Sequence, residues 1–168
     1  MLGEGSTGKE KHNKRMKIII SRYYGDGNVT KSTVTALGNE GQVLWQGEAR
    51  EPHYKDYGND DKVNGCTYMC APKGEYACKI SSTEGNALCV RPLGIKGHRG
   101  CLLYFDSRNR IKLGHILMGY ADEDCPAEMR NLIRVEEAKE VFIALLYQQI
   151  CNEVSLLICN EGCVIGSA

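Results

Sequence analysis

Most of this chain is a succession of short segments with the alternation and residue types of β-strands. Each segment is rich in β-branched, aliphatic or aromatic residues and is bounded by polar or glycine-containing stretches. Strands are predicted at residues 17–24, 29–37, 42–49, 75–81, 87–90, 100–105, 115–120 and 154–159. The sequence Gly-Asn-Glu-Gly at 38–41 predicts a hairpin turn between the second and third of these strands.

One segment, from Val135 to Gln149, has clear helical spacing. Apolar residues recur along one side of it every three or four positions, and Glu136, Glu137, Lys139 and Glu140 lie opposite. The sequence therefore predicts an α+β fold that is mostly β, with one C-terminal helix packed on the sheet.

The domain organisation follows from length and local composition. Residues 1–15 are rich in Gly, Lys and Glu and predict a disordered leader or linker, whereas residues 16–168 are expected to form a single globular domain. Residues 50–65 are polar, with three aspartates and two glycines, and predict an exposed loop.

Charge and hydropathy exclude several kinds of partner. The 21 basic and 21 acidic residues balance, so there is no electrostatic reason to expect nucleic acid or an anionic membrane as the main partner. No apolar run has the length of a membrane span, and residues 1–16 lack the apolar stretch of a secretory signal. The default expectation is a cytoplasmic protein, with export by a signal-independent route left open; the sequence gives no oligomeric state.

The nine cysteines are interpreted mainly as reduced, buried thiols. One of them, Cys101, follows His98 by three residues, a spacing at which a histidine on a suitable turn could activate a thiol nucleophile. The Cys-x-x-x-Cys pairs at 66–70 and 159–163 lack the two-residue gap of common structural zinc sites. No metal and no cofactor is therefore predicted.

His115 is a further candidate for proton transfer. It lies between Gly114 and Gly119, where the backbone can approach a ligand, and histidine exchanges protons near neutral pH. The alternative is a strand histidine held by one hydrogen bond.

Three short motifs, in order, suggest a family. Residues 71–76 resemble a Pro-x-Gly-x-Tyr strand start, residues 97–103 a Gly-x-x-Gly-Ile strand, and residues 113–119 a Gly-Cys-Ile-Leu-x-Gly segment. Over about residues 16–160 the chain thus resembles an uncharacterised bacterial and phage-associated family related to the L,D-transpeptidase-like catalytic domains.

The resemblance implies an altered active site. In that family a histidine and a cysteine form the catalytic pair, but here Tyr104 or Phe105 falls near the histidine position and His115 occupies the cysteine position. The resemblance implies an L,D-transpeptidase-like scaffold that binds a cell-wall peptide or glycan. The expected groove lies near Tyr104, Asp106, Arg108, Asn109 and His115.

Two alternatives stay open at this point. In a rival register, residues 98–101 stand for the His-Gly-Cys of the transpeptidases proper, and the protein is a cysteine-dependent peptidoglycan transpeptidase or peptidase with Cys101 as nucleophile and His98 as base. The other alternative is a structural or interaction module of a phage or secretion assembly.

Overall fold

The computed structural model describes residues 15–52, 70–82, 88–95, 101–112, 114–149 and 153–160. Within these residues the chain forms nine strands, one 3-10 helix and one α-helix. In chain order they are β1 (Arg15–Gly25), β2 (Val29–Leu37), β3 (Val43–Pro52), β4 (Gly74–Ser82), β5 (Leu88–Pro92), β6 (Leu103–Tyr104), β7 (Ile116–Ala121), η2 (Ala127–Met129), β8 (Leu132–Ile133), α2 (Val135–Gln148) and β9 (Glu153–Cys159).

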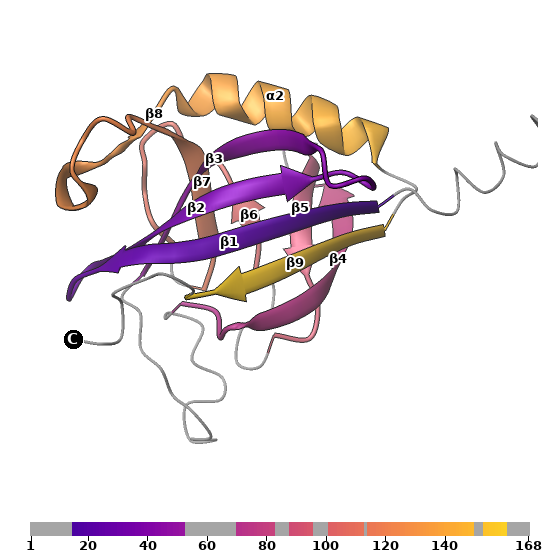
Figure 1. Cartoon of the computed structure of the whole chain (residues 1–168), viewed down its shortest axis with the longest axis horizontal. Helices are drawn as coiled ribbons and strands as arrows, with labels where there is room; N and C mark the ends of the chain where they lie inside the picture. The colour runs from indigo at the N-terminus through magenta and orange to yellow at the C-terminus, as the bar shows by residue number, and fades with distance from the viewer. Residues whose placement is uncertain are drawn as a thin grey trace, which may run out of the picture.

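The strands form one sheet that closes on itself. Their order is β3-β2-β1-β9-β4-β5-β6-β7-β8, and β3 also pairs with β7, so eight strands make a barrel-like sheet with β8 attached outside the ring (Figure 1). The β1–β9 and β6–β7 pairs are parallel and the others are antiparallel. Closure leaves few unpaired strand edges, and it places β2, β3, β7 and β6 side by side.

The interior is filled by alternate residues of each strand. On β1, Met16, Ile18 and Ile20 are fully buried, and the register sets them opposite Val154, Leu156 and Ile158 of β9, which are buried as well. Because side chains of a strand alternate between its two faces, this pattern fixes which face of each strand points inward.

The alternation on β1 continues into a polar end of the interior. Arg22 is fully buried, and its Nε and Nη2 atoms donate hydrogen bonds of 3.1 and 2.9 Å to the two carboxylate oxygens of Glu51 on β3. Nη2 also donates to the carbonyl oxygen of Ala71. Cys70 lies at the same end, where its Sγ is 3.3 Å from the Thr30 hydroxyl. One end of the barrel-like sheet is therefore held by a buried ion pair instead of apolar packing.

The helix α2 covers β3, β5 and β7 (Figure 1). Phe142 is its main anchor, since its ring centroid is 5.0 Å from that of Trp45 and 5.7 Å from that of Phe105. Val135, Ala138, Phe142 and Leu146 are all buried, as the periodicity predicts. The prediction of one C-terminal helix on a mostly β fold is confirmed within the described residues.

The predicted loop at 50–65 is wrong for its first three residues. Strand β3 continues to Pro52, and Arg50 and Glu51 are buried. Charged residues are typical of exposed loops, which is why the sequence predicts a loop here. In the structure Glu51 pairs with Arg22 on the inner face of the sheet, and Arg50 pairs with Glu48. Residues 53–65 lie outside the described residues.

The predicted strand at 100–105 is also too long. Only Leu103 and Tyr104 form β6. The backbone N–H of Leu102 donates to the Nδ1 atom of His115 at 3.1 Å and so does not join a strand ladder. Arg15 belongs to β1 instead of to the predicted leader, of which residues 1–14 lie outside the described part.

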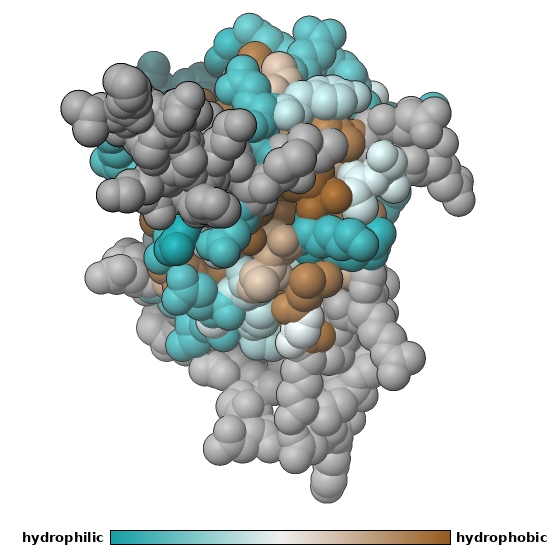
Figure 2. All heavy atoms as spheres, turned by 90° about the vertical axis from the view of Figure 1, so that its right-hand side faces the viewer, coloured by the Kyte–Doolittle hydropathy of each residue, from teal (hydrophilic) through white to brown (hydrophobic). Residues whose placement is uncertain are grey.

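Several large hydrophobic side chains reach the surface. Figure 2, which views the right-hand side of Figure 1, shows hydrophobic side chains between hydrophilic ones on that face. The exposed ones are Val43, Leu93, Ile111, Met129, Ile133, Val141 and Tyr147. In the described parts of the chain no helix has both the length and the apolar character needed to cross a membrane.

Candidate functional site

The thiol of Cys101 does not have the surroundings of a nucleophile. The side chain is 1% exposed. Burial, reinforced by the negative charge of Glu51, raises the pKa of the Cys101 thiol to about 12. A reactive thiol needs a lowered pKa and access to the substrate. The proposed base, His98, lies outside the described residues, so the Cys101–His98 pair stays a prediction, and the environment of Cys101 disfavours it.

Cys101 is expected to alkylate slowly in the folded protein. With a pKa of about 12, roughly one thiol in 100,000 is ionised at pH 7. Iodoacetamide should therefore modify Cys101 at least about a hundredfold more slowly in the folded protein than in guanidinium, as followed by peptide mass spectrometry. Rapid labelling of Cys101 that slows in the His98→Ala variant would instead support the cysteine enzyme.

His115 is held as a neutral imidazole. Its Nδ1 accepts the backbone N–H of Leu102 at 3.1 Å, so the ring proton resides on Nε2. Burial lowers the pKa of His115, and the positive charges of Lys112 and Arg91 lower it further. The ring lies edge-on to Tyr104 with centroids 5.8 Å apart. His115 lies at a bend immediately before β7, and these contacts match the alternative of a histidine fixed by one hydrogen bond.

The predicted groove residues form a hydrogen-bonded loop beside this histidine. The Tyr104 hydroxyl donates to the Arg110 carbonyl and accepts the N–H of Lys112 at 2.7 Å. Asp106 accepts from the backbone N–H of Arg108 and from the Arg110 guanidinium. These donors lower the pKa of Asp106.

Asn109 connects this loop to the rest of the site. It has φ of 54°, a left-handed conformation that asparagine tolerates better than most residues. Its Nδ2 donates to the Leu132 carbonyl of β8 at 3.1 Å. The structure thus brings Tyr104, Asp106, Asn109 and His115 to one region, while Arg108 is exposed on the loop.

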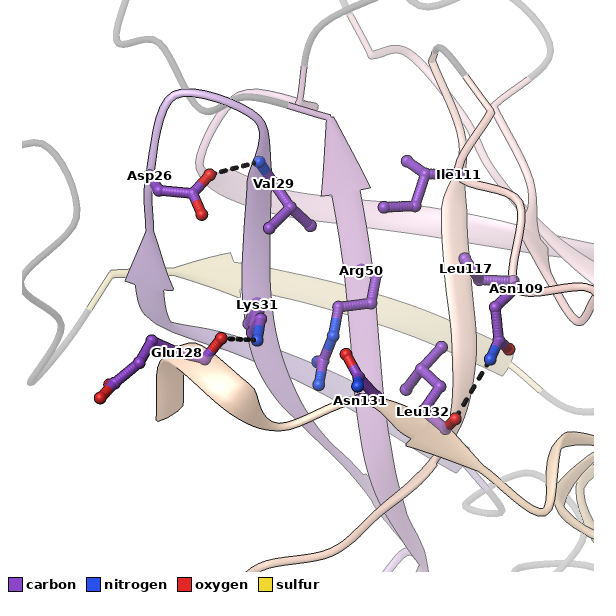
Figure 3. A pocket seen from close by; sticks show the side chains of 10 residues that line it. All are labelled: Asp26, Val29, Lys31, Arg50, Asn109, Ile111, Leu117, Glu128, Asn131 and Leu132. Carbon is purple, nitrogen blue, oxygen red and sulfur yellow. Dashed lines mark hydrogen bonds between the residues drawn. The ribbon is translucent and has the colours of Figure 1, made fainter. Parts of the chain in front are cut away.

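A pocket of about 420 Å³ opens beside Asn109 on the outer face of β2, β3 and β7 (Figure 3). The loop from Asp106 to Lys112 bounds one side, and the β7–β8 connection that contains η2 bounds the other. Its lining residues are Asp26, Val29, Lys31, Arg50, Asn109, Ile111, Leu117, Glu128, Asn131 and Leu132.

The strand register places the wall of the pocket and the predicted groove in one row. Lys31 on β2 is opposite Arg50 on β3, Arg50 is opposite Leu117 on β7, and Leu117 is opposite Tyr104 on β6. Directly paired residues point to the same face of a sheet. The predicted residue Tyr104 therefore lies in the same row as the two cations of the pocket.

Lys31 is 4% exposed. Its Nζ donates to the carbonyl oxygens of Ala127, Glu128 and Arg130 at 2.8, 3.1 and 2.9 Å. These bonds use all three ammonium protons and fix the η2 segment over the sheet. Within the described residues Lys31 has no carboxylate within salt-bridge distance. Burial lowers the pKa of Lys31, and the neighbouring Arg50 lowers it further.

Arg50 belongs to a second buried group. Its Nη1 donates to Glu48 Oε1 at 2.8 Å, and its Nη2 donates to the Arg130 carbonyl at 2.7 Å. Glu48 also pairs with the Arg130 guanidinium at 3.2 Å and accepts the Tyr23 hydroxyl. Burial, together with the hydrogen bond to Glu48, raises the pKa of Tyr23 to about 12. Glu48 thus accepts hydrogen bonds from Arg50, Arg130 and Tyr23.

The rest of the pocket is mixed in character. Val29, Ile111, Leu117 and Leu132 supply apolar surface. Asp26 accepts the backbone N–H groups of Asn28 and Val29, and these bonds lower the pKa of Asp26. Ordinary ligand sites have this composition, with apolar walls and a few placed polar groups.

Neither a metal-binding cluster among the described residues nor a similar protein adds to this description of the site. The described residues contain no group of three or more His, Cys, Asp or Glu side chains that could hold a metal ion. In comparisons with known proteins, no family model, curated protein or solved structure matches the chain.

The sequence did not single out Lys31 or Arg50. Lys31 lies within a predicted strand and Arg50 at the start of a predicted loop, and neither forms part of a recognisable motif. Their pairing depends on the β2–β3 register. The strands on either side of the predicted turn at 38–41 contain several other polar residues, so the sequence alone does not distinguish Lys31 and Arg50 from them.

Proposed function

We propose that this protein is a binding domain that holds a ligand in the pocket between β2, β3, β7 and η2, without thiol catalysis. The observation that carries the proposal is the pair of buried cations, Lys31 and Arg50, on the wall of a pocket of about 420 Å³. Backbone carbonyls and Glu48 compensate much of the cost of burying these two charges. Two like charges side by side at a pocket still favour recognition of a ligand with negative or polar groups.

A cell-wall peptide or glycan is the ligand that the sequence resemblance implies. Peptidoglycan stem peptides combine carboxylates, amides and short aliphatic groups. The pocket offers two cations, the amides of Asn109 and Asn131, and apolar walls for such a ligand. A glycan would use mainly the amides. The relation to L,D-transpeptidase-like domains itself stays a prediction.

Calorimetric titration with a purified disaccharide–tetrapeptide muropeptide tests this function. We expect saturable heat, and we expect a weaker signal from the disaccharide alone than from the tetrapeptide alone. Asn131→Trp should block the pocket, because Asn131 is an exposed lining residue. Gln46→Trp places the same bulk at an exposed position of β3 and serves as the matched control.

The opposite result would support the interaction module. If none of the three probes gives saturable heat, the binding function is wrong. Concentration-dependent self-association of the same sample, measured by analytical ultracentrifugation, would then favour the structural alternative.

A further inference from the structure

The two cations of the pocket are placed against each other. Lys31 and Arg50 are directly paired across β2 and β3, and each is 4% exposed. Like charges directly opposite in a sheet destabilise it, and burial strengthens their repulsion. A protein that keeps such a pair beside a pocket has an unfavourable interaction that a bound anion would relieve.

The neighbouring charges do not neutralise the pair. The charged groups that act on Lys31 are Arg50 and Arg130 on the positive side and Glu48 and Asp26 on the negative side. Glu128 also lines the pocket, but its carboxylate points away from Lys31 in Figure 3 and its backbone carbonyl is the acceptor. Of these carboxylates only Glu48 forms an ion pair with the group, and it is shared between Arg50 and Arg130. Within the described residues Lys31 therefore has no carboxylate of its own.

Only one of the two cations has hydrogens to offer. The three Lys31 protons are donated to backbone carbonyls. Arg50 donates two hydrogens from Nη1, to Glu48 and to the Ala49 carbonyl, and one from Nη2 to the Arg130 carbonyl. A guanidinium carries five N–H groups, so one on Nε and one on Nη2 make no hydrogen bond within the described residues.

We propose that the pocket recognises a ligand carboxylate, which accepts these two N–H groups of Arg50 while Lys31 supplies positive charge behind it. The rest of the ligand is a short aliphatic group that packs against the apolar lining residues Val29, Ile111, Leu117 and Leu132. This inference rests on the proposed binding function and specifies the ligand class for that pocket.

A carboxylate fits better than a phosphate monoester. Arginine holds a planar carboxylate through two parallel N–H groups. Asp26, whose pKa is lowered by the N–H groups of Asn28 and Val29, lines the same pocket as Glu128, and the two carboxylates would repel a dianion more strongly than a monoanion.

A matched pair of small probes tests the inference. N-acetyl-leucine and N-acetyl-leucinamide have almost the same shape, but only the first carries a carboxylate. Each is titrated into the ¹³C-methyl-labelled full chain at pH 7, and the signals of Val29, Leu117 and Leu132 are followed by NMR. We expect the acid to bind at least about tenfold more tightly than the amide.

Variants of Arg50 distinguish the effect of its two N–H groups from the effect of its positive charge. Arg50→Gln should abolish the preference for the acid, and circular dichroism checks that the variant is folded. Arg50→Lys is the second variant, which keeps the charge but loses the fork and should reduce the preference. Arg15→Gln removes an exposed arginine of β1 that does not line the pocket and should leave the preference unchanged.

The possible outcomes point to different conclusions. Isopentyl phosphate, titrated in the same way, serves as the phosphate monoester probe. Equal binding of acid and amide, tighter binding of isopentyl phosphate than of the acid, or no binding of either leucine probe would overturn the carboxylate inference. Those results leave the proposed function intact as long as the muropeptide still binds saturably. Loss of muropeptide binding as well would overturn both.

Discussion

Replacement of Arg22 by methionine is expected to lower the free energy of unfolding by about 3–5 kcal/mol, because it leaves a buried carboxylate without its cation. Glu51 has a side chain that is 1% exposed and is bonded to Arg22 through both of its oxygens. After the substitution only the Ala71 N–H, at 3.3 Å, still donates to it among the described residues. Chemical unfolding followed by circular dichroism measures the change.

The controls use a second ion pair and a compensating substitution. Lys17→Met removes the cation of the exposed Lys17–Glu75 pair, which is 3.4 Å apart, and should cost less than about 1 kcal/mol. Adding Glu51→Leu to Arg22→Met removes the unpaired carboxylate and should restore much of the loss. Equal effects of Arg22→Met and Lys17→Met would show that the buried pair does not hold this end of the sheet.

Replacement of Phe142 by alanine is expected to lower the free energy of unfolding by about 3–5 kcal/mol, because it opens a cavity where α2 meets the sheet. The Phe142 side chain is 1% exposed and packs against Trp45 and Phe105. For a chain of this length the loss corresponds to a fall in Tm of roughly 6–20 °C. Thermal unfolding followed by circular dichroism measures it, and Trp45, the single tryptophan, reports the local change by fluorescence.

Val141→Ala is the matched control for Phe142→Ala. Val141 is the neighbouring helix residue and is 46% exposed, so its truncation should change the free energy of unfolding by less than about 0.5 kcal/mol. If the two variants had the same Tm, α2 would not be packed on β3 and β7 through Phe142.

The strands and the helix could be predicted because local pattern dictates them. The predicted strand at 29–37 matches β2 residue for residue, and the predicted helix differs from α2 by one residue at its end. The turn at 38–41 is formed as well, with Gly41 at φ of 79° and the Gly38 N–H bonded to the Gln42 carbonyl. Alternation and turn chemistry act over a few residues, so a sequence shows them directly.

The polar interior could have been found from the same alternation. Arg22 continues the even-numbered series Met16, Ile18 and Ile20, and a period of two places it inside. Its partner Glu51 is 29 residues away and falls in the predicted loop at 50–65. The charge of each residue favoured exposure when it was taken alone, and only the closed sheet brings them together.

Of the predicted groove residues only Asn109 lines the pocket, while Tyr104 and His115 lie beside the same loop. The sequence points to the loop and the histidine and does not point to the two cations of the pocket. Lys31 and Arg50 meet through the β2–β3 register, and the pocket exists because β3 pairs with β7 and because Lys31 holds η2 over the sheet. Neither contact leaves a local signal in the sequence.

Closure of the sheet links the fold to the proposed function. At the β3–β7 contact Glu48 is opposite Gly119, and an added Cβ at Gly47 would lie 2.6 Å from the Gly119 carbonyl oxygen. This close approach brings Arg50 to Leu117 and completes one wall of the pocket. The same strand β3 carries Glu51 inward and Arg50 outward, so the buried ion pair and the pocket are built on adjacent residues.

An amide NMR titration of the full chain with the disaccharide–tetrapeptide muropeptide locates the bound ligand on the protein. We expect saturable shifts at Lys31, Arg50, Leu117, Asn131 and Leu132 in the wild-type protein, and their loss in the Asn131→Trp variant. Saturable shifts that avoid these residues, or that persist in Asn131→Trp, would contradict the assignment of the pocket as the binding site.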